Sequence, residues 1–364
     1  MLTRQNKEMH YPMTTALSDL LARISPADDG TARAAQRRLD QLTKPPGSLG
    51  ALEPLVVQLA AATGQITPRF DAPAVIIAAA DHGVVAEGVS PYPQAVTAQM
   101  VLNFLADGAA INALAANAGT RVIVVDAGVA SDLPDHPELR RAGVRRGTAN
   151  MLHESAMTRA EAEAMIHSGA ALVAKEAAHG LDLLALGEMG IGNTTAAACL
   201  TCALADVSPE QATGRGTGLD DAGLAHKRAV VAAILERARP QASDPLGMLA
   251  EVGGLEIALL VGATLEAAAR RIPVVLDGYI ATSAALVAAA LAPHATAYMV
   301  AAHRSAEPGH RAALGKLGLT PLLELDLRLG EGSGAALALP LIQGVTRAMR
   351  EMATFEGAGV SDRL

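Results

Sequence analysis

Glutamates and glycine-rich loops are the residues of this chain best suited to chemistry. The segment Gly187–Thr195 has three glycines ahead of an alanine-rich stretch, and backbone N–H groups in such a loop can approach an anion closely. A second glycine-rich segment, Gly214–Gly218, is followed by Lys227, which suits a phosphate group as a point charge. Glu331, between two glycines, would serve as a general base if apolar surroundings raised its pKa.

Each of these features also has a purely structural interpretation. The Gly187–Thr195 segment matches neither GxGxxG nor a Walker A motif, and it fits a tight strand-to-helix turn with Asn193 or its neighbour as the helix cap equally well. The Gly214–Gly218 segment fits a flexible surface loop. Glu331 fits an exposed turn residue that favours a helix N-terminus, and Glu188 has the same ambiguity. Spacing alone leaves these alternatives open.

Cysteine and histidine form no metal-site pattern. Cys199 and Cys202 make a CxxC within a run of Ala and Leu, with no second CxxC or paired histidines nearby, so two buried thiols are the favoured interpretation. The ten histidines are scattered without an HExxH motif. His82 and His303 each follow an apolar run and could contact a ligand or fill the core. We expect no metal and no cofactor.

The elements that position these residues follow from hydrophobic periodicity. After Pro73, short continuously apolar runs alternate with helical segments. The expected strands are 75–80, 122–126, 181–186, 274–277, 297–302 and 322–327. The expected helices are 97–116, 158–178, 195–205, 224–239, 255–271, 280–291 and 334–352, with 149–157 and 206–222 as loops. Continuously apolar strands joined by helices predict a parallel sheet that is covered on both faces.

We therefore expect an α/β fold, with a doubly wound, mainly parallel, Rossmann-like sheet of six strands and helices on both faces. In such sheets ligands bind outside the carboxyl ends of the strands. All six segments that follow the expected strands contain a carboxylate, and five contain glycine. The polar groups of the chain thus converge on one edge of the predicted sheet.

The chain divides into a helical N-terminal part and an α/β part. Helical spacing at 18–24, 32–42 and 49–63 predicts a small helical domain within residues 1–70, which the C-terminal helix could complete. Residues 71–352 are the expected catalytic α/β domain, and 353–364 are a tail. We expect the first dozen residues to be disordered or an extension.

Composition argues against several classes of protein. Seven aromatic residues in 364 and a net charge of -8 disfavour a stacking platform or a phosphate-backbone partner, so we expect no nucleic-acid ligand. Two cysteines cannot form a disulfide framework. Neither a signal peptide nor a membrane-length apolar run is apparent. We expect a cytoplasmic protein with no membrane partner.

Seven segments, in order, resemble a known family: 43–50, 81–100, 187–195, 214–218, 276–278, 303–310 and 328–335. From about residue 39 to residue 352 the chain is similar to the nicotinate-nucleotide–dimethylbenzimidazole phosphoribosyltransferases of the cobalamin lower-ligand pathway. The family usually has Thr where Ser333 stands, and this difference keeps the hydroxyl group.

The resemblance implies transfer of the 5-phosphoribosyl group from nicotinate mononucleotide to 5,6-dimethylbenzimidazole. The implied products are α-ribazole 5′-phosphate and nicotinate, with inversion at C1′, and the implied general base is Glu331. The implied phosphate contacts are Gly190, Gly216, Lys227, Gly278 and Ser305. The implied benzimidazole pocket contains Ser90, Tyr92, Gln99, Glu188, Met189 and Leu329. Further substrate contacts are expected at Gly192, Asn193, Asp277 and Gly330. A homodimer is also implied.

The chemistry agrees with these residue types. The leaving nitrogen of a nicotinate nucleotide is already cationic and needs no general acid, whereas the attacking benzimidazole must lose a proton, for which one carboxylate suffices. Two other functions compete. A nicotinamide-dependent dehydrogenase would need GxGxxG after the first strand, which is absent. A non-catalytic nucleotide sensor would not need Glu331.

Overall fold

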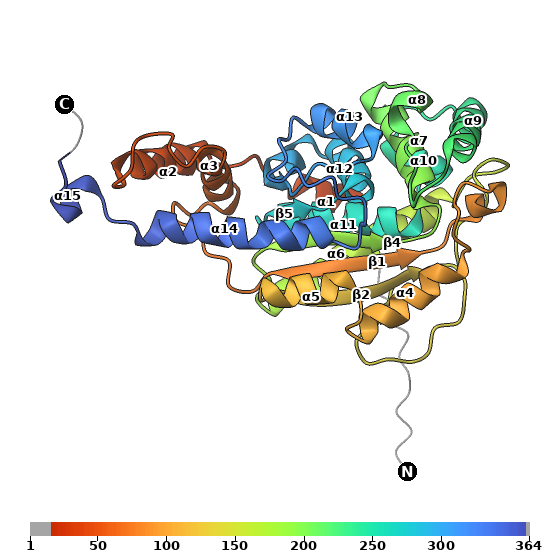
Figure 1. The fold of residues 1–364 in the computed structure, drawn as a ribbon, viewed down its shortest axis with the longest axis horizontal. Coiled ribbons are helices and arrows are strands. Elements are labelled where there is room, and N and C mark those ends of the chain that lie inside the picture. The colour runs from red at the N-terminus through yellow and green to blue at the C-terminus, as the bar shows by residue number, and fades with distance from the viewer. Residues whose placement is uncertain (1–15, 362–364) are drawn as a thin grey trace, which may run out of the picture.

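A parallel sheet surrounded by helices forms the body of the protein, and a helical arm extends from it (Figure 1). The computed structural model describes residues 16–361, so the expectation for the first dozen residues lies outside the described part. The strands are β1 (Ala74–Ala80), β2 (Arg121–Gly128), β3 (Leu139–Arg141), β4 (Leu184–Met189), β5 (Val274–Leu276) and β6 (Met299–Ala301). They pair in the order β3-β2-β1-β4-β5-β6, with every pair parallel, which confirms the predicted fold class.

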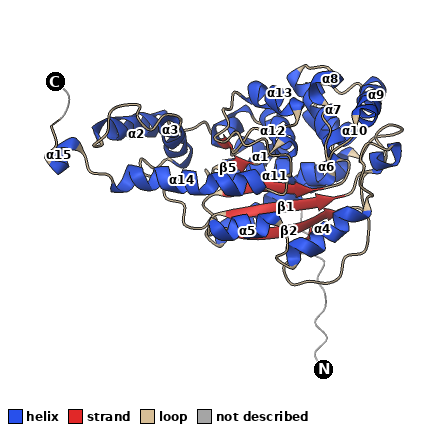
Figure 2. Cartoon of the chain, in the orientation of Figure 1, coloured by secondary structure: helices blue, strands red, loops and turns tan. Residues whose placement is uncertain are grey.

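Alternate residues of β1 supply two separate hydrophobic cores. Ile76 and Ala78 face one core, and Val75 and Ile77 face the other, because successive side chains of a strand point to opposite faces. All seven residues of β1 are buried. Helices therefore cover both faces of the sheet, as Figure 2 shows.

The larger core lies between the sheet and an extensive group of helices. Helices α1 (Leu17–Ala22), α6 (Arg159–Ala178), α10 (Pro245–Val252), α11 (Leu255–Ala269) and α12 (Tyr279–Leu291) belong to it. Further buried residues of this core come from α7 (Asn193–Ala205), α8 (Pro209–Ala212), α9 (Asp221–Ala238), α13 (Pro308–Leu317) and the 3₁₀ segment η2 (Pro293–Tyr298). Gly169 and Gly262 let α6 and α11 pack closely, since a Cβ at Gly262 would lie 1.8 Å from the Ile166 carbonyl oxygen.

The second core is covered by α4 (Ala95–Leu105), α5 (Ala110–Asn117) and α14 (Ser333–Glu351). Helix α14 continues past the sheet into the arm, where α2 (Asp29–Gln41) and α3 (Leu52–Thr63) pack beside it (Figure 1). The tail forms α15 (Phe355–Ala358) and pairs with the end of α2 through an antiparallel Leu42–Thr354 bridge. Within the arm, Glu53 pairs with Lys44 at 2.7 Å and accepts the N–H of Gly47 and Leu49.

Three expectations for local structure are wrong. Residues 322–327 form no strand. They run beside the end of β6, with a parallel bridge between His303 and Leu323 and hydrogen bonds from the Leu322 and Leu323 N–H groups to the Ala301 and Ala302 carbonyls. The sixth strand is β3, a three-residue edge strand with two arginines, for which the sequence has no apolar run. Residues 97–116 form two helices, because the chain turns between α4 and α5 at Asp107, which has positive φ. The expected loop 206–222 contains the short helix α8.

The strand order reverses between β1 and β4. This reversal is the position at which doubly wound sheets bind ligands, outside the carboxyl ends of the strands. The turn after β1 becomes the 3₁₀ segment η1 (Gly83–Glu87), and the turn after β4 leads into α7 at Asn193. Among residues 16–361, no helix is long and apolar enough to cross a membrane.

Candidate active site

Glu331 lies at the carboxyl edge of the sheet, in the loop that leads into α14. Its side chain is buried, and Oε2 has no hydrogen-bond partner within the described residues. A Cβ on Gly187 of β4 would lie 2.6 Å from the Glu331 carbonyl carbon, so only glycine lets the strand and this loop meet. Burial and then the negative charge of Asp277 raise the pKa of Glu331 to about 7. A carboxylate with such a pKa fits a general base at neutral pH.

Glu188, at the end of β4, lies next to the same loop. Asn193 donates a hydrogen bond to its Oε2, and a Cβ on Gly330 would lie 2.5 Å from its Oε1. Burial and then the charges of Asp277 and Glu256 raise the pKa of Glu188 to about 8. The structure thus brings together Glu188, Asn193, Gly330 and Glu331, which the sequence predicted as site residues.

Lys227 enters the site from α9 and is 1% exposed. Its Nζ donates a 2.6 Å hydrogen bond to Thr194 Oγ1 in the first turn of α7, and a Cβ on Gly216 would lie 3.1 Å from that Nζ. Burial lowers the pKa of Lys227 to about 8, against the opposing influence of Glu307. Lys227 and Gly216 are therefore side by side, as their predicted role in phosphate binding requires.

Ser305 and Gly278 belong to the adjacent strand-end loops. Their positions are close, because a Cβ on Gly278 would lie 3.8 Å from the Cβ of Ser305. His310 fixes both loops: its Nδ1 accepts the Ser305 N–H at 2.9 Å, and its Nε2 lies 2.9 Å from Thr282 Oγ1, whose hydroxyl donates to the Gly278 carbonyl. Burial lowers the pKa of His310 to about 3, so the ring is neutral and Nε2 is the donor.

A cavity of about 440 Å³ opens at the lysine end of the site. Gly216, Glu307 and Arg328 are among the residues that line it. Glu307 Oε1 accepts the Gly216 N–H at 2.9 Å, while its Oε2 is buried without a partner in the described residues. This carboxylate therefore occupies a backbone donor that was predicted to bind phosphate.

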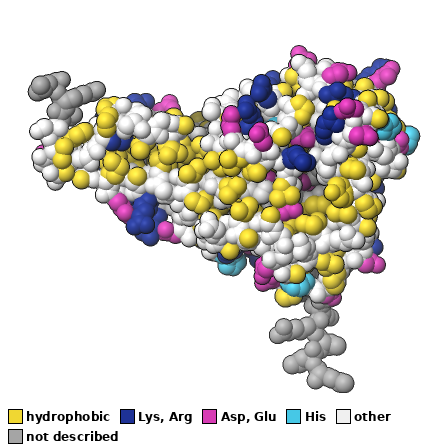
Figure 3. Space-filling view, viewed as in Figure 1, with side chains coloured by type: hydrophobic (Ala, Val, Ile, Leu, Met, Phe, Trp, Pro, Cys, Tyr) yellow, Lys and Arg dark blue, Asp and Glu magenta, His cyan; other side chains and the backbone are white. Residues whose placement is uncertain are grey.

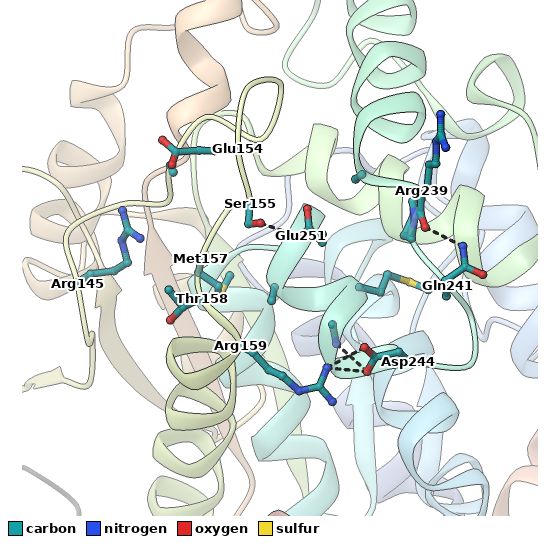
Figure 4. Close-up of a pocket in the computed structure, with 16 residues that line it drawn as sticks. Arg145, Glu154, Ser155, Met157, Thr158, Arg159, Arg239, Gln241, Asp244 and Glu251 are labelled. Atoms are coloured by element: carbon teal, nitrogen blue, oxygen red, sulfur yellow. Dashed lines mark hydrogen bonds and ion pairs between the residues drawn. The ribbon is translucent and has the colours of Figure 1, made fainter.

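A larger cavity, of about 670 Å³, lies away from these residues (Figure 4). It is bounded by the start of α6, the loop before it, the end of α9, and α10. Two pairs of its lining side chains bond to each other: Arg159 pairs with Asp244 at 2.7 Å, and Ser155 donates to Glu251 at 2.7 Å. None of the predicted site residues lines it, so volume alone does not mark the chemistry.

Comparison with known proteins identifies the family. The profile of the DBI_PRT family, described as phosphoribosyltransferase, matches residues 24–360. The chain belongs to this phosphoribosyltransferase family. A relative from Chloroflexus aurantiacus, named nicotinate-nucleotide–dimethylbenzimidazole phosphoribosyltransferase, is 54% identical over 341 residues, which are 94% of this chain and 97% of the relative. A relative of the same name from Deinococcus radiodurans is 53% identical over 353 residues, covering 95% and 96%.

A solved family structure has the same fold. The crystal structure of CobT from Thermus thermophilus is 51% identical, with a TM-score of 0.89, and the match covers 92% of this chain and all of that one. A second structure from that organism, described as the nicotinate-nucleotide–dimethylbenzimidazole enzyme, matches with 50% identity and a TM-score of 0.88. The family resemblance inferred from the sequence is thereby confirmed.

Other predicted site residues lie outside the hydrogen-bond network described above. Leu329 is 54% exposed and Tyr92 is 49% exposed. Ser90 Oγ lies 3.4 Å from Thr217 Oγ1, next to the Gly216 loop. Gln99 is exposed on α4, and Met189 is half-buried against the second core. Their roles as a benzimidazole pocket stay predictions.

Three more predicted site residues lie in the turns that follow β4 and β5: Gly190, Gly192 and Asp277. Gly192 caps α7 with φ 93°, and a Cβ there would lie 2.7 Å from Val85. A Cβ on Gly190 would lie 2.6 Å from the Ala80 carbonyl oxygen. Asp277 is 2% exposed and accepts backbone N–H groups from the start of α14.

From the sequence His82 could contact a ligand or fill the core, and the other buried partners of this site were missed. His82, after β1, lies 2.7 Å from Glu256 of α11, with both side chains fully buried. Thr194, Glu307 and His310 each hold a predicted site residue or its loop. All of these residues except Glu256 stand in segments that carry the family resemblance, and no local pattern marks Glu256. Among residues 16–361 no group of three acidic, His or Cys side chains is placed to hold a metal ion. The expectation of no cofactor stays a prediction.

Proposed function

We propose that this protein transfers the 5-phosphoribosyl group of nicotinate mononucleotide to 5,6-dimethylbenzimidazole, giving α-ribazole 5′-phosphate and nicotinate. Its family membership and the names of its relatives support this reaction. The observation that carries the proposal is Glu331, a buried carboxyl group with an unpartnered oxygen and a pKa raised to about 7, at the sheet edge where ligands of this fold bind.

In the proposed reaction a ring nitrogen of the benzimidazole forms a bond to C1′ of the ribose. The C1′–N bond to nicotinate breaks, and its electron pair goes to the pyridinium nitrogen, which becomes neutral. The N–H proton of the benzimidazole goes to Glu331. Because nucleophile and leaving group lie on opposite faces of C1′, a single displacement inverts that carbon from β to α.

The phosphate of the nucleotide is proposed to bind beside Lys227, Gly190, Gly278 and Ser305, and beside Gly216, whose N–H is bonded to Glu307 in this structure. The first turn of α7 lies beside it, since Lys227 donates to Thr194 there, and a helix N-terminus favours an anion. A phosphate dianion next to Lys227 would also favour the protonated amine, which burial disfavours. The lysine is thus charged most completely when the substrate is bound.

The benzimidazole is proposed to lie near Glu188, Met189 and Leu329, with Tyr92, Ser90 and Gln99 at the entrance. The exposure of Tyr92 and Leu329 supports this placement, because exposed apolar side chains are available to cover an aromatic ring. Gly192, Asn193, Asp277 and Gly330 are placed near the substrates in the same proposal.

The decisive experiment combines the purified protein with nicotinate mononucleotide and dimethylbenzimidazole. We expect nicotinate release that depends on both substrates, and a product with the α configuration by nuclear magnetic resonance. Runs with a chelator and with added divalent metal test the proposal that no metal is needed. No nicotinate release under either condition would contradict the proposed function.

We also propose that the protein is a homodimer that works in the cytoplasm. Exposed Ile66, Leu341 and Val360 lie on or beside the helices of the arm, and Figure 3 shows hydrophobic side chains gathered along it. A second copy of this chain is the proposed occupant of that surface. Analytical ultracentrifugation should give twice the 37.1 kDa chain mass, and a monomer would contradict the proposal. The cysteines, both free and buried, agree with a reducing compartment.

A further inference from the structure

The loop that carries Glu331 has an unusual backbone. Gly330, Glu331 and Gly332 all have positive φ, of 78°, 65° and 83°, and a glutamate in this region is sterically disfavoured. The loop ends at α14, whose cap residue, Gly332, has no side chain to accept the first N–H groups of the helix. A group from elsewhere must therefore hold the loop and cap the helix.

That group is the carboxylate of Asp277, which follows β5. Its Oδ1 accepts the N–H of Gly334 at 2.7 Å and of Ala335 at 3.0 Å, and its Oδ2 accepts the N–H of Gly332 at 3.1 Å. By contrast, α2 is capped by the residue directly before it, Asp28, whose side chain accepts the Thr31 N–H. The cap of α14 thus comes from a different strand of the sheet.

The same carboxylate lies among the ionisable groups of the site. Glu331 is faced by Asp277 after β5 and by Glu188 from β4, both of which are buried. His303, after β6, has its Nε2 3.5 Å from Asp277 Oδ1. Helix α5, which packs against α14, has no charged residue. After burial, the charge of Asp277 is the largest cause of the raised pKa of Glu331.

We propose that Asp277 is a positioning residue for the proton transfer, because its carboxylate holds the Glu331 loop on the N-terminus of α14. The negative charge of Asp277 also favours proton uptake by Glu331. This inference rests on the proposed function of Glu331 as the base. Both oxygens of Asp277 already accept backbone N–H groups, which favours this role over the substrate contact expected from the sequence.

The test is the variant Asp277→Asn, which removes the charge and places an amide donor opposite one of the backbone donors. We expect kcat to fall by about 30-fold or more, while KM for nicotinate mononucleotide stays within about threefold, as for loss of a transition-state contribution. The acid limb of the kcat/KM profile should move to lower pH by about one unit, because a neighbouring negative charge no longer disfavours ionised Glu331. Hydrogen exchange of the amides at 332–335 should accelerate about tenfold.

Asp28→Asn is the matched control, since it changes another capping aspartate in the arm, and it should leave the kinetics and the pH profile unchanged. An unmoved acid limb, unchanged amide exchange, or a KM raised tenfold with kcat retained would each overturn the role of Asp277. Should Asp277→Asn fail to fold, Asp277→Ser, which keeps a smaller acceptor, is measured in the same way. A wild-type protein without transferase activity would contradict the proposed function instead, and the exchange measurement would still report whether Asp277 holds the loop.

Discussion

The two ends of the site contain opposite charges in equally buried surroundings. At the base end, Glu331, Glu188 and Asp277 lie together, and burial raises the pKa of Glu331 to about 7 and that of Glu188 to about 8. At the phosphate end, burial lowers the pKa of Lys227 to about 8. Burial disfavours every charged form. It therefore raises the pKa of the carboxyl groups and lowers the pKa of the lysine, which brings both toward neutral pH.

The difference shows how one fold prepares two kinds of group for neutral pH. A neighbouring negative charge helps to raise the pKa of Glu331, and Asp277 supplies that charge. The lysine has a carboxylate nearby, Glu307, which opposes the effect of burial. In the proposed reaction each end is completed by its ligand: a proton from the benzimidazole at one end, and a phosphate dianion at the other.

The largest expected effect comes from removing the base. Glu331→Gln should lower kcat by about 10³-fold, because the proposed proton acceptor is lost, while affinity for nicotinate mononucleotide is retained. Steady-state kinetics and calorimetric titration with the nucleotide measure the two quantities. Glu324→Gln, at an exposed position earlier in the same segment, is the control. Unimpaired turnover in Glu331→Gln would show that Glu331 is not the general base.

Removing the positive charge of Lys227 should weaken substrate binding rather than slow the reaction. Lys227→Ala should weaken nicotinate mononucleotide by about 10- to 100-fold, roughly 1.5–3 kcal/mol for a lost charged hydrogen bond, with a much smaller change in kcat at saturation. The affinity for dimethylbenzimidazole, which has no phosphate, should not change. Lys316→Ala, an exposed lysine on α13, is the control. An unchanged affinity for nicotinate mononucleotide would contradict the proposal that Lys227 binds its phosphate.

The two ends should appear as the two limbs of one pH profile. The base is active when deprotonated, so kcat/KM should fall about tenfold per unit below the raised pKa of Glu331 near 7. Lys227 is proposed to bind the phosphate in its protonated form, so kcat/KM should fall again above the lowered pKa of Lys227 near 8. Lys227→Arg should move the alkaline limb alone to higher pH, since arginine stays protonated. Movement of both limbs would mean that the two ends are coupled.

The smallest effect is on stability. The pKa of Glu331 is raised from 4.5 in the unfolded chain to about 7 in the fold, so the folded protein loses stability as pH rises through this range. Glu331→Gln should therefore raise the free energy of unfolding by roughly 1–3 kcal/mol at pH about 8 and by much less at pH about 4. Denaturant titrations at the two pH values measure it. Glu356→Gln, at an exposed site, should show no such pH-dependent gain.

Local sequence was a good guide for the central strands β1 and β2, whereas β4 (Leu184–Met189) lies three residues beyond its predicted range of 181–186. The apolar runs that became β1 and β2 predicted both strands to within about two residues, because a central parallel strand is buried on both faces. The same rule failed at the sheet's edge. Residues 322–327 have the leucines of a strand and hydrogen-bond to the end of β6, but they form an isolated bridge and no strand, whereas the arginine-rich β3 pairs with β2. Edge pairing depends on which partner is free, and no local pattern reports that.

The sequence by itself determined the family, the parallel sheet and the loops where polar residues follow the strands. Glu331 and Lys227 could be named from those loops, since glycine spacing and residue type are local properties. Only the tertiary structure decided that Asp277 caps α14 and that Glu307 engages Gly216. These contacts join residues 57 and 91 positions apart. The burial that shifts the pKa values also arises only when separate strands and helices pack together.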